Sequence, residues 1–181
     1  MEMENTTAKR WLAAKRERVV EEGPVEVTVF VRSLSPPLGV RQRQEQILGQ
    51  LQDLQESDVI DSYQVNLWGG GVCLCDVCSG TSVAESMLDS VEQFEKWAAE
   101  QGDVTLPFER KRVESTVIGR TDRDLVVPSV CLSVTTGAEL EGVFPCTVAG
   151  ESISVTDFVE LLSEADAVGT RAANQDQVVQ I

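Results

Sequence analysis

Residues 25–31 read Val25-Glu26-Val27-Thr28-Val29-Phe30-Val31, and the assignment of the other elements starts from the strand that this alternation indicates. Valine at every second position is typical of a β-strand with one buried face. The proline-rich stretch over 35–39 ends the strand, and apolar residues then recur at helical spacing to about Ser57. We therefore predict a strand that leads directly into a helix.

The same reasoning, carried along the chain, assigns the remaining elements. They are a strand over 60–67, a tight Trp-Gly-Gly-Gly turn at 68–71 into a short strand over 72–75, a helix from Thr81 to Gly102, an extended run over 104–117, strands over 125–135 and 139–146, and a last helix that opens at Thr156. We expect residues 1–23 to form a polar, basic N-terminal arm or helix, 24–166 a single domain, and 167–181 a flexible polar tail.

This order predicts an α+β protein. Over 25–114 it gives strand, helix, strand, strand, helix, strand, the ferredoxin-like βαββαβ core, followed by a C-terminal β-hairpin and helix. A thioredoxin-like domain uses the elements differently, with Pro128 before an antiparallel hairpin and the final helix. That alternative lacks the Cys-x-x-Cys motif, because residues 33–37 contain no thiol.

The charge balance limits both the environment in which the protein is expected to work and the chemistry that it can carry out. The chain has 30 Asp and Glu against 15 Lys and Arg, a formal net charge of -15, and no histidine. Such a surface is suited to high salt, which screens its self-repulsion, so we expect a halophilic cytoplasmic protein. The absence of histidine excludes Ser-His-Asp, Cys-His and His-metal sites, and we expect no enzymatic activity and no bound cofactor. No apolar run is long enough to span a membrane.

Several stretches resemble a family of small acidic haloarchaeal proteins known as helix-turn-helix domain proteins. The resemblance covers roughly residues 25–165 and is carried by the segments 31–34, 37–39, 68–69, 72–74, 94–98, 106–109 and 143–146. It implies a halophilic cytoplasm and a DNA-associated, regulatory role, and it brings no catalytic residues. Residues 47–54 and 59–65 resemble the end of a winged-helix unit, but a βαβ crossover explains the same pattern and we favour it.

The candidate nucleic-acid contacts are local clusters of basic residues. They are Lys9, Arg10, Lys15, Arg16 and Arg18 near the N-terminus, and Arg41 and Arg43 at the start of the first long helix. A solvated helix of mixed charge is the simpler explanation of the first cluster. Because phosphate contacts weaken steeply with salt, we expect DNA to be a partner only through sequence-specific contacts, and the same argument applies to Arg110-Lys111-Arg112. A homodimer through a sheet edge or through the helix from Thr81 is compatible with this pattern.

The five cysteines suggest an alternative function. Cys73, Cys75 and Cys78 place three thiols within six residues, and Cys131 or Cys146 would complete a zinc site of thiolates alone. Only Cys75-x-x-Cys78 has zinc-knuckle spacing, and no second pair follows. Small buried side chains are the simpler explanation, and a thiol-based metal or redox module stays as the alternative.

Overall fold

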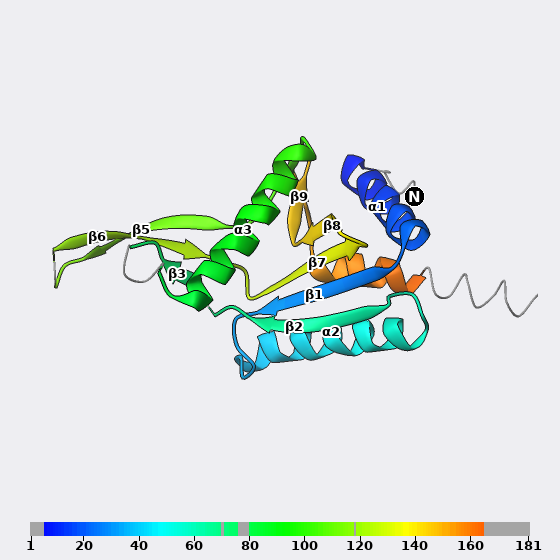
Figure 1. Cartoon of the computed structure of the whole chain (residues 1–181), viewed down its shortest axis with the longest axis horizontal. Coiled ribbons are helices and arrows are strands. Elements are labelled where there is room, and N and C mark those ends of the chain that lie inside the picture. The colour runs from blue at the N-terminus through cyan, green and yellow to red at the C-terminus, as the bar shows by residue number, and fades with distance from the viewer. Residues whose placement is uncertain (1–5, 70, 76–79, 118, 165–181) are drawn as a thin grey trace, which may run out of the picture.

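The computed structural model describes residues 6–69, 71–75, 80–117 and 119–164. Its centre is a four-stranded sheet with the order β2-β1-β7-β8 (Figure 1). Strand β1 runs parallel to β2 and antiparallel to β7, which is antiparallel to β8. The four strands are β1 (Val25–Val31), β2 (Ser62–Leu67), β7 (Val130–Thr136) and β8 (Glu139–Phe144).

Two smaller sheets flank this centre. One has the order β3-β6-β5, from β3 (Gly71–Cys73), β5 (Glu109–Ser115) and β6 (Arg120–Val126). The other has the order β10-β9-β4, from β4 (Val104–Thr105), β9 (Cys146–Val148) and β10 (Glu151–Ile153). The antiparallel pair β5 and β6, here called the ribbon, projects away from the body of the protein (Figure 1).

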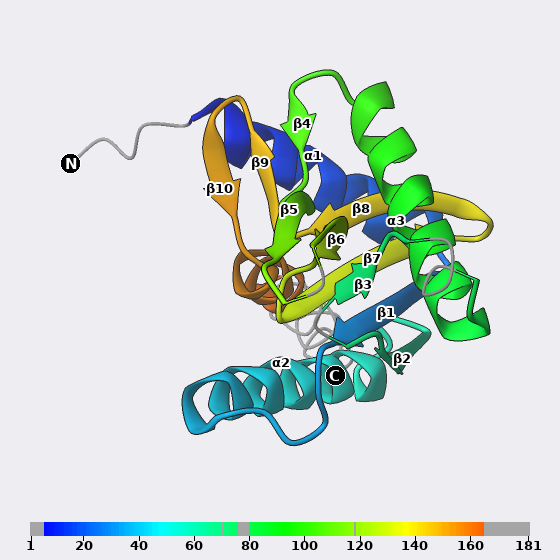
Figure 2. The ribbon, with the colours of Figure 1, turned by 90° about the vertical axis from the view of Figure 1, so that its left-hand side faces the viewer.

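The helices are α1 (Thr7–Glu22), α2 (Leu38–Glu56), α3 (Ser82–Glu100) and a helical stretch over 155–164. Helices α2 and α3 lie on opposite faces of the central sheet (Figure 2). On the α2 side, Ile47, Leu51 and Leu54 are buried, and on the α3 side Phe94 packs against Phe30 of β1. None of the described helices has the length and apolarity needed to cross a bilayer.

The α3 start confirms the predicted cap. The hydroxyl of Thr81 accepts a hydrogen bond from the backbone N–H of Ala84 at 3.3 Å, which satisfies one of the unpaired donors of the first turn. The apolar stripe then buries Met87, Val91, Phe94 and Trp97. The predicted helix and the observed one therefore agree, because the apolar stripe and the cap both indicate a helix that begins after Thr81.

The α+β class is confirmed, but the ferredoxin-like arrangement is not and has to be corrected. Strands β3 and β5, which would belong to that core, lie in a separate sheet, while β7 and β8 take their places beside β1. The physical reason is burial: β7 is buried at nearly every position, as a central strand must be, whereas 109–114 carries charges on both faces. With β3, β4, β5 and β6 left aside, the strands of the central sheet and the helices between them follow the order β1-α2-β2-α3-β7-β8, which is the element order of the thioredoxin-like alternative.

The predicted hairpin between residues 60–67 and 72–75 is also wrong. Strand β2 pairs with β1, and β3 pairs with β6 instead. Gly71 is needed where these strands meet, because a Cβ at this position would lie 2.4 Å from the carbonyl oxygen of Leu125. The glycines therefore permit a close strand contact in addition to the turn at Gly69, whose φ is +71°.

Candidate nucleic-acid interface

Two of the predicted basic residues on α1, Lys15 and Arg18, make contacts within the protein. The Nε of Arg18 lies 3.1 Å from the carboxylate of Glu141 and 3.3 Å from that of Glu22, and its Nη2 lies 3.4 Å from Glu139. Glu141 raises the pKa of the Arg18 guanidinium. The ammonium of Lys15 lies 5.5 Å from the centroid of the Trp11 ring, and burial lowers its pKa. Lys15 also lies 5.7 Å from the ring centroid of Trp97 on α3, so this contact and the ion pairs of Arg18 with Glu139 and Glu141 fasten α1 to the body.

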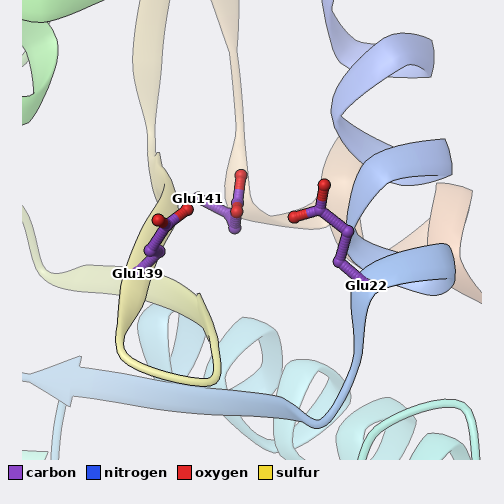
Figure 3. A group of neighbouring side chains, drawn as sticks. All are labelled: Glu22, Glu139 and Glu141. Carbon is purple, nitrogen blue, oxygen red and sulfur yellow. The ribbon is translucent and has the colours of Figure 1, made fainter.

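The carboxylates around Arg18 form an acidic cluster that resembles a metal site. Figure 3 shows Glu22 from α1 converging with Glu139 and Glu141 from β8, and one oxygen of each lies within 4.8 Å of the others. Arg18 contacts all three, and the Thr136 hydroxyl donates to Glu141 at 2.9 Å. The guanidinium therefore offsets one of the three negative charges, and its ion pairs account for the convergence of these carboxylates.

The other α1 bases are more accessible. Lys9 and Arg10 are exposed in the first turn, and Arg16 is half-buried. They share one helix with Glu17, Glu21 and Glu22, which is the mixed-charge pattern of a solvated helix. Lys9 and Arg10 are thus accessible on the surface, whereas Lys15 and Arg18 are engaged in contacts within the protein.

Helix α2 is a crossover helix and does not form the second half of a helix-turn-helix. Strand β1 precedes it and the parallel strand β2 follows it, so α1 and α2 are separated by a strand. Its apolar face is buried on the sheet, as the βαβ interpretation predicts. Arg41 lies 3.8 Å from Glu45 on the same helix, and Arg43 is exposed.

The ribbon carries an arrangement that the sequence reasoning missed. In the β5–β6 register Arg112 stands directly opposite Arg123. Opposite residues of an antiparallel pair point to the same side, with Cβ atoms about 5 Å apart, and like charges in such a pair destabilise each other. Both side chains are exposed, and neither has a carboxylate within ion-pair distance among the described side chains.

The alternation of the strands gives the ribbon two different faces. The face that we call the arginine face contains Arg110, Arg112, Glu114, Thr121, Arg123 and Leu125. Nearest the body, Arg110 makes a bidentate ion pair with Glu95 of α3 at 2.7 and 2.9 Å, and the hydrogen bond raises its pKa. The opposite face contains Lys111, which lies 3.3 Å from Glu109 and is opposite Asp124. Among the described basic side chains of the ribbon, Arg112 and Arg123 are thus the ones without an ion-pair partner.

No group of three or more thiols forms among the described residues. Cys73 and Cys75 are half-buried at the base of the ribbon, and Cys78 lies outside the described residues, so the three-cysteine zinc site stays a prediction. Cys131 and Cys146 are buried in the core. Burial raises the pKa of the Cys146 thiol to about 12 and also raises that of Cys131, so burial opposes the thiolate form that zinc binds.

Comparison with known proteins gives one finding. A family model described as a helix-turn-helix domain matches residues 20–167, which is most of the chain. Comparisons with curated proteins and with solved structures give no significant match.

Proposed function

Because the chain belongs to the helix-turn-helix domain family, we propose that it is a DNA-associated regulatory protein of a salt-rich cytoplasm, without enzymatic activity. We further infer that it contacts duplex DNA through the arginine face of the ribbon. The observation that carries this proposal is the direct opposition of Arg112 and Arg123, both exposed, in a chain with 30 acidic and 15 basic residues.

The shape of the ribbon suits the proposed ligand. The major groove of B-DNA admits an α-helix or a two-stranded β-ribbon, and α2 has its apolar face committed to the sheet. The ribbon extends beyond the body, so it can enter a groove while the body stays outside (Figure 1). An anionic partner between Arg112 and Arg123 would also relieve the repulsion between their guanidinium groups.

The net charge argues for sequence-specific contact. A chain with a charge of -15 is repelled by DNA as a whole, and salt weakens phosphate contacts steeply. Hydrogen bonds to base edges depend less on salt, and arginine bound in a bidentate manner to the O6 and N7 of guanine is the commonest specific contact. We therefore propose that Arg112 and Arg123 read guanine-containing sites.

Recovery of chromatin with the tagged protein, expressed in a host with high internal salt, tests the function. The proposal predicts enrichment of discrete sequences that share a short motif containing guanine. A flat genomic profile, together with no enriched motif from a random duplex pool in molar KCl, would rule out direct DNA contact.

A further inference from the structure

The two edges of the central sheet are protected very differently. At the β8 edge, Glu139 and Glu141 carry charges, and the pairing with β7 shifts register between Val134 and Thr135. Helix α1 is also fastened there through Arg18. Charged side chains, bulges and covering helices are the usual means by which a sheet edge avoids pairing with another strand.

The β2 edge lacks the charged side chains and the register shift of the β8 edge. Ser62–Leu67 contains no charged residue and no proline, and it pairs with β1 through six consecutive positions without a shift. Tyr63 is half-buried and the other five residues are exposed. In the described part of the chain no strand pairs with its outer side, so its backbone N–H and C=O groups form a ready template for another strand.

The charge pattern favours approach at this edge. Residues 62–75 contain no Asp, Glu, Lys or Arg, although 25% of the chain is charged. Two copies with a charge of -15 each repel one another over most of their surfaces. The charge-free edge is where two copies meet with the least repulsion.

Apolar side chains are exposed along the same edge. Val65 is 38% exposed and Leu67 is 57% exposed, and Val83 of α3 is 69% exposed. Together with Phe30 and Trp68 they line a hollow of about 450 Å³ between β2 and α3. Contact with another chain at β2 would remove this apolar surface from water.

The sequence of β2 is complementary to itself. Tyr63, Val65 and Leu67 alternate with Gln64 and Asn66, so the pattern of apolar and amide side chains is the same in both directions around Val65. In an antiparallel pair centred on Val65, Tyr63 stands opposite the partner's Leu67, Gln64 opposite the partner's Asn66, and Val65 opposite the partner's Val65. A slip by one residue would place apolar side chains opposite amides.

We propose that two copies of this chain pair antiparallel through β2, with the two-fold axis at Val65, and join their central sheets into one. Such an interface is isologous, because each residue contacts the partner as the partner contacts it. The assembly does not depend on DNA binding. It would present two ribbons related by the same axis, which suits a palindromic site.

Sedimentation equilibrium of the purified chain in molar KCl, without DNA, tests this assembly. The proposal predicts about twice the chain mass of 19.8 kDa. A monomer would overturn it, and this result would leave the DNA proposal standing. A monomer is also what is expected if the edge instead binds an extended peptide of another protein.

Variants locate the interface. Val65→Glu places two carboxylates opposite each other at the axis, where they lose water, and should give the monomer mass. Asn66→Glu adds a charge at an exposed position and should do the same, which covers the case in which Val65→Glu fails to fold. Val113→Glu, on the ribbon at 43% exposure, is the matched control and should stay dimeric. A dimer that persists in a folded edge variant, or is lost equally in the control, would overturn the proposal.

Discussion

The Nε of Arg18 lies 3.1 Å from the carboxylate of Glu141, and this ion pair joins α1 to the central sheet. Glu141 is only 2% exposed, and its carboxylate contacts Arg18 and accepts the hydrogen bond from Thr136. A buried carboxylate without compensation is strongly unfavourable. The basic cluster on α1 is therefore partly a structural feature, and its sequence does not reveal which members are free.

Removal of Arg18 should destabilise the fold through the carboxylate that it leaves behind. Arg18→Met is expected to lower Tm by several degrees, and Arg18→Met combined with Glu141→Gln should recover part of the loss. Arg41→Met, which breaks a weaker pair with Glu45 at 3.8 Å, should change Tm little. Thermal denaturation followed by circular dichroism measures all three. Additive losses in the double variant would show that the pair is not coupled.

Stability should fall in alkaline solution because of the buried thiols. Burial raises the pKa of Cys146 to about 12 and also raises that of Cys131, whereas a thiol ordinarily has a pKa of 9.0. Between about pH 9 and pH 12 the unfolded chain loses protons that the folded chain keeps, so the free energy of unfolding decreases with pH. Each thiol contributes about 1.4 kcal/mol per pH unit. Denaturant unfolding of Cys146→Ala should show a correspondingly smaller slope, and an unchanged slope would contradict the assignment.

Gly71 should be essential to the base of the ribbon. Gly71→Ala drives a methyl group against the backbone of Leu125 and should disrupt the pairing of β3 with β6. Gly49→Ala is the matched control, because nothing lies within 4 Å of its added methyl in the middle of α2. That change should stabilise the fold by about 0.5–1 kcal/mol. Amide hydrogen exchange over β3 and β6 measures the first effect. Unchanged protection in Gly71→Ala would contradict the observed strand contact.

Zinc should not be required for folding. Only Cys75-x-x-Cys78 has the usual spacing, and Cys131 and Cys146 are buried in the core, where burial raises the pKa of both thiols. Metal analysis of protein purified under reducing conditions should find no stoichiometric zinc, and a chelator should leave Tm unchanged. One zinc per chain with thiolate ligation would instead support a thiol-based metal module built on Cys73, Cys75 and Cys78.

The fold was predictable where one face of an element is buried and the other is exposed to solvent. The alternation over 25–31 and the stripe of α3 gave the right elements, because burial leaves a period in the sequence. The pairing of the strands was not predictable from periodicity. Strand β7 pairs with β1 and is buried on both faces, and a strand buried on both faces shows no alternation that would mark its partner. The Arg112–Arg123 pair was missed for a related reason: Lys111, Arg112, Val113 and Glu114 are all exposed, so burial imposes no period on this part of the ribbon.

The affinity of the protein for a duplex carrying the enriched motif tests the central proposal most directly. Fluorescence anisotropy in molar KCl would compare the wild-type chain with Arg112→Gln/Arg123→Gln and with Lys111→Gln. The latter removes one charge from the opposite face of the same ribbon. The account predicts a loss of about a hundredfold for the double variant, about tenfold for each guanidinium, and little change for Lys111→Gln. Equal affinities for all three, with circular dichroism showing that each is folded, would contradict DNA recognition by the arginine face.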